Sequence, residues 1–122
     1  DVSKTVVATG KQTEGGWIDV CHSDKLEKED VLRFDYENKT YAIYRTVDDE
    51  YYATDGLCTH GKTHLVDGMV KGYLIECPKH NGRFDIRDGS PQRRPACKEL
   101  QTYAVSIKDG RLLLDVTSRS SE

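Results

Sequence analysis

The sequence predicts an all-β protein, an antiparallel β-sandwich or small barrel built from short strands. Runs rich in Val, Ile, Thr and Tyr recur along the chain, and clusters of Gly, Asp and Asn separate them. The length of 122 residues is that of a single domain, so we expect residues 1–122 to share one fold.

Short β-rich runs alternate with turn signals along the chain. In the run 40–46, Tyr41, Ile43 and Arg45 alternate with Ala42 and Tyr44, and turn residues on both sides join it to its neighbours as an antiparallel meander. The turn Lys108–Gly110 predicts a hairpin with Gly110 in the left-handed conformation. A short helix is expected over Ser23–Val31, with Ser23 as its N-cap. The predicted strands are 17–21, 31–36, 40–46, 51–54, 100–107 and 111–116.

Two Gly-rich segments between the predicted strands lack strand periodicity. Residues 58–64 and 77–95 are therefore expected to be loops. The segment Asp67–Gly72, "DGMVKG", is expected to be a turn, because the strand, phosphate loop and helix of a nucleotide site do not surround it.

The charge of the chain is small but unevenly distributed. A formal net charge of −3 gives no general attraction to nucleic acid or to an anionic membrane. Between Cys58 and Lys98, however, eight Lys and Arg residues stand against four Asp and Glu residues. No apolar run approaches the roughly 20 residues that span a bilayer, and the start of the sequence lacks the sections of a signal peptide. We expect a soluble, cytoplasmic protein.

The Gly-rich segments contain two paired motifs of metal-binding residues. Cys58 and His60 are one residue apart, Cys77 and His80 are two apart, and sixteen residues separate the pairs. Two such loops can clamp one inorganic centre between two thiolates and two imidazoles. Zinc accepts this donor set, but common zinc sites pair cysteine with cysteine and histidine with histidine. Here each loop supplies one cysteine and one histidine.

The motifs Cys-x-His and Cys-x₂-His at this separation resemble those of the Rieske family. The flanking stretches "YYATDGLCTHG", "GRFDIRDG" and "LQTYAVSIKDGRLLLDV" resemble it as well, so the resemblance covers about residues 15–117. It implies a Rieske-type fold with a cluster-binding part at about 57–96, formed by two loops. It also implies one [2Fe–2S] cluster, with Cys58 and Cys77 on the inner iron and His60 and His80 on the outer iron.

The resemblance implies an electron carrier without a catalytic site of its own. Such ferredoxins take electrons from an NAD(P)H-dependent flavoprotein reductase and pass them to a terminal, aromatic-ring-hydroxylating oxygenase. Once His60 and His80 are assigned to the cluster, only His22 and His64 remain. A terminal oxygenase holds a second iron by two histidines and a carboxylate on a separate catalytic domain, and these two histidines do not lie on such a domain. We expect a monomer. The alternatives are a Rieske-like non-catalytic subunit and a zinc-stabilised interaction module.

The resemblance also implies a low reduction potential. Respiratory Rieske proteins carry cysteines at the positions of Thr63 and Lys79, and these join the two loops by a disulfide. They also carry serine and tyrosine at the positions of Gly82 and Phe84, whose hydroxyls donate hydrogen bonds to a cluster sulfur and to a cysteine ligand and raise the potential. This chain has neither hydroxyl.

Other residues have weaker predicted roles. The basic residues Lys62, Lys79 and Arg83 near the motifs are expected to contact the partner proteins. His22 is expected to be structural and His64 to lie at the surface or contact a partner. The remaining thiols, Cys21 and Cys97, are expected to be buried or incidental.

Overall fold

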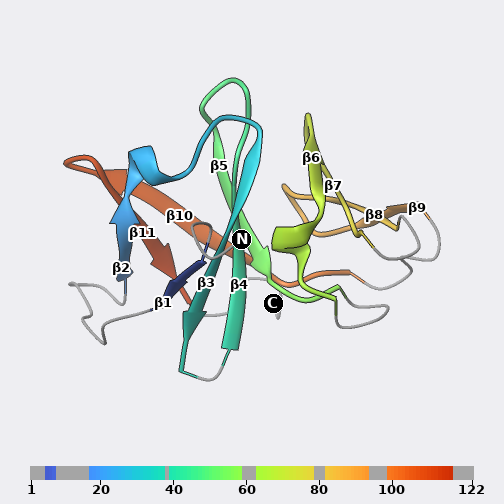
Figure 1. The fold of residues 1–122 in the computed structure, drawn as a ribbon, viewed down its shortest axis with the longest axis horizontal. Coiled ribbons are helices and arrows are strands. Elements are labelled where there is room, and N and C mark those ends of the chain that lie inside the picture. The colour runs from blue at the N-terminus through green and yellow to red at the C-terminus, as the bar shows by residue number, and fades with distance from the viewer. Residues whose placement is uncertain are drawn as a thin grey trace.

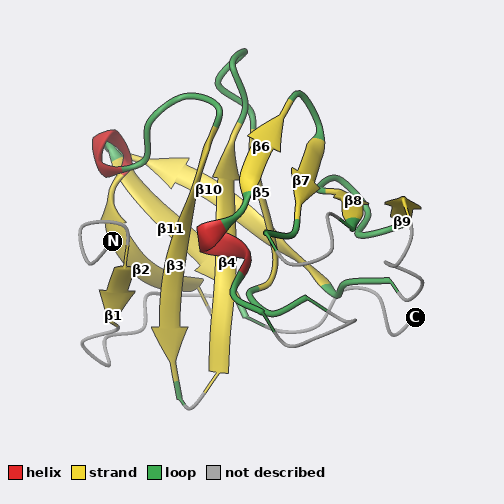
Figure 2. Cartoon of the chain, turned by 45° about the vertical axis from the view of Figure 1, so that its right-hand side comes forward, coloured by secondary structure: helices red, strands yellow, loops and turns green. Residues whose placement is uncertain are grey.

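The computed structural model describes residues 5–7, 17–37, 39–58, 63–78, 82–93 and 99–116, whose strands form two sheets (Figure 1). The large sheet has seven strands in the order β1-β3-β4-β5-β10-β11-β2 and curves into a nearly closed barrel (Figure 2). The small sheet has four strands in the order β6-β7-β8-β9. The prediction of an all-β fold is confirmed. The strands are β1 Thr5–Val7, β2 Trp17–His22, β3 Asp30–Tyr36, β4 Lys39–Arg45, β5 Tyr51–Asp55, β6 Met69–Lys71, β7 Leu74–Glu76, β8 Arg83–Asp85, β9 Pro91–Arg93, β10 Thr102–Lys108 and β11 Arg111–Asp115.

The predicted meander and hairpin are both present. Strands β3, β4 and β5 pair in sequence as antiparallel neighbours. Strands β10 and β11 form the hairpin, and its turn places Asp109 and Gly110 at φ 52° and 77°. Two consecutive positive φ values suit the right-handed twist of the flanking strands.

Three local predictions need correction. The expected helix over Ser23–Val31 is a 3-10 turn of three residues, Ser23–Lys25. Its N-cap is His22, whose Nδ1 accepts a hydrogen bond from the N–H of Asp24, so Ser23 is already inside the turn. The segment 69–71 is a strand rather than a turn, and 83–85 and 91–93 are strands rather than loops; 74–76, for which no element was predicted, is also a strand. In the described part of the chain, no helix is both long and apolar enough to cross a membrane.

Strand β1 extends the large sheet in a way that the sequence did not predict. It pairs in parallel with β3, with Thr5 opposite Arg33. Val6 packs against the core of the large sheet, so β1 adds both backbone pairing and apolar contact at this edge.

Two clusters of buried side chains form the core. The first lies within the large sheet and includes Ile18, Phe34, Ile43 and Leu112. The second joins the two sheets, because residues of β3 and β4 pack with inward-facing residues of the small sheet. Its members are Val31, Ala42, Tyr44, Cys58, Leu65, Val70, Ile75, Cys77, Phe84, Ile86 and Leu100.

A polar contact also ties the turn between β6 and β7 to the large sheet. The hydroxyl of Tyr73 donates a 2.6 Å hydrogen bond to Oε1 of Glu50, and the rings of Tyr73 and Tyr52 meet edge to face at 6.1 Å. The guanidinium of Arg87 lies 4.1 Å from the centre of the Tyr73 ring. The small sheet is thus held at this end as well as by its buried face.

We expect Gly89→Ala to destabilise the fold more than Gly72→Ala. Both glycines have positive φ, 79° and 57°, so both variants carry similar backbone strain. A Cβ at Gly89 would also overlap the carbonyl of Leu100, whereas a Cβ at Gly72 meets nothing within 4 Å. Urea denaturation of the two variants measures the difference. Equal losses of stability would show that the turn at Gly89 can move away from Leu100.

Candidate metal centre

The first predicted ligand loop has a closed backbone neck. After β5, the N–H of Cys58 donates a 2.8 Å hydrogen bond to the carbonyl of Thr63, five positions later. The adjacent residues Leu57 and His64 form an isolated antiparallel bridge. The predicted ligand His60 falls between the two ends of this neck.

The second predicted ligand loop has the same neck. The N–H of Cys77 donates a 2.7 Å hydrogen bond to the carbonyl of Gly82, again five positions later. Glu76 and Arg83, on either side, are paired residues of β7 and β8. Each loop therefore starts at a cysteine and is bounded by an antiparallel pair seven positions apart.

Both loop cysteines are buried in the same place. Cys58 is 3% exposed and Cys77 is 1% exposed, and neither forms a disulfide. Both belong to the core cluster between the sheets, where Leu65 and Ile75 also pack. Apolar surroundings keep water from two thiolate donors and suit an iron–sulfur centre, whose properties depend on solvent exposure.

The remaining predicted ligands lie outside the described residues. This holds for His60 and His80, and also for Lys62 and Lys79, two of the residues expected to contact partners. Among the residues that are described, no three His, Cys, Asp or Glu side chains are grouped as a metal site. The described half of the predicted donor set, two buried cysteines at matched necks, fits a Rieske-type cluster.

An ion pair crosses the second neck. Nε of Arg83 lies 2.9 Å from Oε1 of Glu76, and both side chains are partly buried. Part of the charge of Arg83 is therefore balanced by Glu76. Sequence reasoning missed Glu76, although a carboxylate directly before Cys77 and a cation seven positions later were a visible signal of such a pair. Further along β8, Phe84 is fully buried.

His64 was expected to lie at the surface or to contact a partner. Its side chain is partly buried, its Nδ1 has no hydrogen-bond partner among the described residues, and its contact with a partner stays a prediction. It is close enough to Asp35 to affect that carboxyl electrostatically. Burial raises the pKa of Asp35, but hydrogen bonds from Arg33 and Thr40 outweigh it, and the pKa lies below its usual value.

The remaining histidine and the other two cysteines lie away from the two loop necks or outside the described residues. His22 is structural, as expected, because it caps the 3-10 turn. Cys21 is buried at the end of β2, and burial raises the pKa of its thiol. Cys97 lies outside the described residues.

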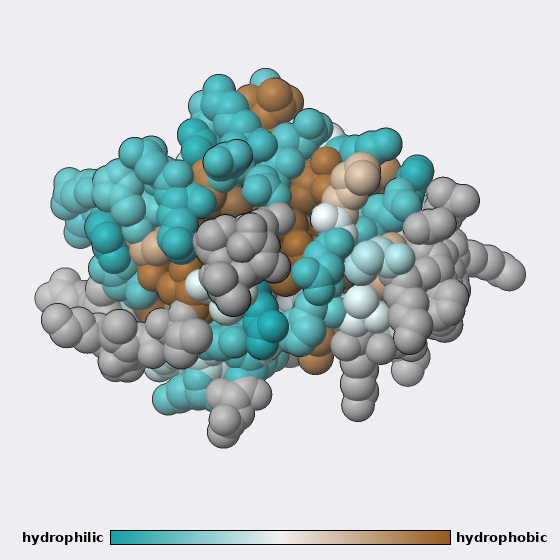
Figure 3. Space-filling model, viewed as in Figure 1, coloured by the Kyte–Doolittle hydropathy of each residue, from teal (hydrophilic) through white to brown (hydrophobic). Residues whose placement is uncertain are grey.

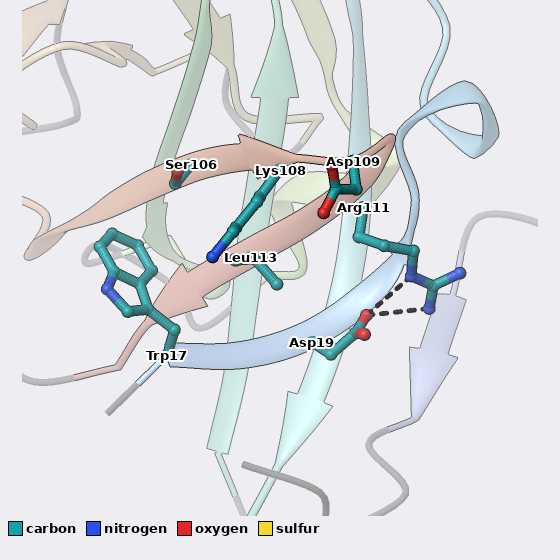
Figure 4. Close-up of a pocket in the computed structure, with 7 residues that line it drawn as sticks. All are labelled: Trp17, Asp19, Ser106, Lys108, Asp109, Arg111 and Leu113. Atoms are coloured by element: carbon teal, nitrogen blue, oxygen red, sulfur yellow. Dashed lines mark hydrogen bonds and ion pairs between the residues drawn. The ribbon is translucent and has the colours of Figure 1, made fainter. Parts of the chain in front are cut away.

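A separate groove of about 540 Å³ lies on the outer face of β2, β10 and β11 (Figure 4). Trp17 and Leu113 give it an apolar part, and the ion pair between Arg111 and Asp19 lines one side. Its described lining contains neither cysteine nor histidine, so it offers no soft or imidazole donors for a metal cluster.

Comparison with known proteins identifies the class. The family model for the Rieske [2Fe-2S] domain matches residues 16–104, and the chain belongs to this family. The resemblance inferred from the Cys–His motifs is thereby confirmed.

Several similar proteins are ferredoxins. The chain is 44% identical over 102 residues to the ferredoxin component of the naphthalene 1,2-dioxygenase system of Pseudomonas putida, covering 83% of this chain and 96% of that one. It is 42% identical over 98 residues to the ferredoxin component of the naphthalene 1,2-dioxygenase/salicylate 5-hydroxylase systems of Ralstonia sp., and the alignment covers 80% of this chain and 93% of that one. A chain in the solved complex of reduced oxygenase and oxidized ferredoxin in carbazole 1,9a-dioxygenase superposes with a TM-score of 0.80 at 30% identity, covering 85% of this chain and 96% of that chain.

Proposed function

We propose that this chain is a soluble cytoplasmic electron carrier with no catalytic site of its own. It binds one [2Fe–2S] cluster through Cys58, His60, Cys77 and His80, within a single domain whose cluster-binding part is about 57–96. The matched loop necks carry the proposal, since they bring one buried cysteine from each motif to a shared apolar core. When bound, the cluster supplies a one-electron redox couple.

The proposed partners are two proteins of one oxygenase system. An NAD(P)H-dependent flavoprotein reductase donates the electron, and a terminal oxygenase, one that hydroxylates aromatic rings, accepts it. Similarity to ferredoxin components of naphthalene dioxygenase systems over most of both chains supports this assignment. We propose that the carrier acts as a monomer, with Lys62, Lys79 and Arg83 contacting its partners.

The chain's own residues have defined tasks in this proposal. The necks fix where each loop leaves its strand, and the apolar core around Cys58 and Cys77 excludes water from the thiolates. Gly82 has no side chain, so the backbone can approach the cluster closely there. Arg83 and Glu76 reinforce the second neck.

Metal analysis of purified protein tests the function and the ligand set together. We expect equal amounts of iron and acid-labile sulfide in wild type, and loss of both in Cys77→Ala, because the cluster cannot form without one of its thiolates. Cys21→Ala is the matched control, since Cys21 is also a buried thiol but belongs to the other core cluster. A colourless wild type containing zinc would overturn the proposal in favour of an interaction module.

We expect reversal of Lys62 and Lys79 to Glu to lower the rate of electron transfer several-fold at low ionic strength. Opposite charge on a partner speeds the encounter, and salt screens it, so the effect should fade as ionic strength rises. Lys25→Glu is the control, because this exposed lysine lies in the 3-10 turn far from the small sheet (Figure 2). Equal rates for all variants at low salt would contradict charge-assisted docking.

The reduction potential should lie near the bottom of the Rieske range of roughly −150 to +300 mV. Gly82→Ser and Phe84→Tyr should each raise it, because an added hydroxyl can donate a hydrogen bond that stabilises the reduced state. Protein-film voltammetry measures both effects. Phe84 is fully buried, so thermal unfolding must be measured alongside to separate a new hydrogen bond from disturbed packing. A wild-type midpoint well above zero would contradict the low-potential assignment.

A further inference from the structure

An ion pair lies at the base of the second ligand loop. Glu76 directly precedes Cys77, and Arg83 directly follows Gly82, whose carbonyl accepts the N–H of Cys77. The Nε–H of Arg83 donates a 2.9 Å hydrogen bond to Oε1 of Glu76 across the paired strands β7 and β8. One negative and one positive charge are therefore held beside the neck that carries a proposed cluster ligand.

Apolar side chains flank this ion pair. Met69 of β6 lies opposite Glu76, and Met69 and Leu74 line a small hollow of about 40 Å³ together with both charged residues and the exposed Lys71. The side chain of Glu76 is 24% exposed and that of Arg83 is 34% exposed. Figure 3 shows apolar surface next to polar side chains over the small sheet. Charges with restricted access to water are screened less by solvent and salt than freely exposed charges, so each acts over a longer range.

The corresponding positions of the first neck, which the structure also describes, hold no ion pair. They are Leu57, directly before Cys58, and His64, seven positions after Leu57, and the two form the isolated bridge. Leu57 carries no charge. The first neck nevertheless closes with the same hydrogen bond from a cysteine N–H to a carbonyl five positions later. An ion pair is therefore not required to form a neck, and its presence at the second neck needs another reason.

The proposed centre is sensitive to fixed charges beside it. Reduction adds one negative charge at the two loops, so a nearby charge changes the reduction potential, and the direction of the change follows from the sign of that charge. A carboxylate disfavours the added electron and lowers the potential. A guanidinium favours the added electron and raises it. In the ion pair of Glu76 and Arg83 these two effects offset each other.

We infer that Glu76 and Arg83 are potential-setting residues, and that Glu76 offsets the rise in potential that an unbalanced Arg83 would cause. The inference rests on the proposed function and adds to it two determinants of the potential that are not cluster ligands. It also gives the pairing a purpose. A cation that is proposed to contact a partner can remain beside the loop while the potential stays low.

Redox titration of the purified protein without partners, followed by visible absorption, tests the two signs. Glu76→Gln leaves Arg83 unbalanced, and we expect the ratio of reduced to oxidised protein at a fixed potential to rise about three-fold or more, an upward shift of about 28 mV for a one-electron couple. Arg83→Gln leaves Glu76 unbalanced and should lower this ratio by a similar factor. In the double variant the two shifts should largely cancel.

Variants that conserve charge separate this effect from a loss of structure. Glu76→Asp shortens the carboxylate arm and Arg83→Lys removes the planar donor group, so both weaken the hydrogen bond across the neck but keep the charges. We expect both to keep a potential near that of wild type. Asp19→Asn and Arg111→Gln are the matched controls and should not shift the potential. Asp19 and Arg111 form a 2.8 Å ion pair on β2 and β11, on the opposite side of the molecule from the small sheet (Figure 1).

Three results would overturn the inference: shifts of the same sign in Glu76→Gln and Arg83→Gln, no shift in either, or charge-conserving variants that shift as far as the neutral ones. Shifts of one sign would show that a disturbed neck, and not the charge, moves the potential. If a glutamine variant does not retain iron and sulfide, Glu76→Met or Arg83→Met replaces it, because methionine removes the charge and can pack with Met69 and Leu74. Failure of the proposed function is a separate result, namely wild-type protein without iron and acid-labile sulfide.

Discussion

The paired loop necks are the constraint on which the rest of this structure depends. In each, the N–H of a cysteine closes the loop onto a carbonyl five positions later, and an antiparallel pair bounds it. The loops contain little apolar material, so their own residues cannot fix where they lie. Their position is set by the strands they leave, β5 for the first and β7 with β8 for the second, and by the core cluster that both cysteines enter. Two loops can share one centre only if both necks hold their cysteines in the right place at the same time.

The two necks keep their relative position only if the small sheet is firmly attached to the large one. Its inner face packs Ile75 and Phe84 into the cluster that contains Tyr44. The hydroxyl of Tyr44 is fully buried against Thr54 at 2.8 Å, and burial raises its pKa, so the ring remains neutral as a core member. At the far end of β7 from Cys77, the contact between Tyr73 and Glu50 resists rotation of the sheet. Packing and this polar contact together hold the second loop against the first.

Sequence reasoning predicted the long strands, which are confirmed, and it proposed the donor residues, but it did not predict the small sheet. Strands β3 and β4 run for seven residues each and are rich in β-branched and aromatic side chains, and the Cys–His spacings are the signal for the proposed donors. Strands β6 to β9 have three residues each, too few to show a period of two. The parallel pairing of β1 with β3 and the exposure of Met69 depend on contacts between distant segments, which no local pattern encodes.

In the proposed function one carrier serves two partners, and it must meet each quickly and leave each quickly. The sequence has a cationic excess between Cys58 and Lys98 and an anionic remainder, and in this proposal that asymmetry helps an acidic partner to approach. Binding that rested on many exposed cations would hold a partner too long at low salt. The pairing of Arg83 with Glu76 balances part of the charge of a residue proposed to contact a partner, and it also braces the second neck.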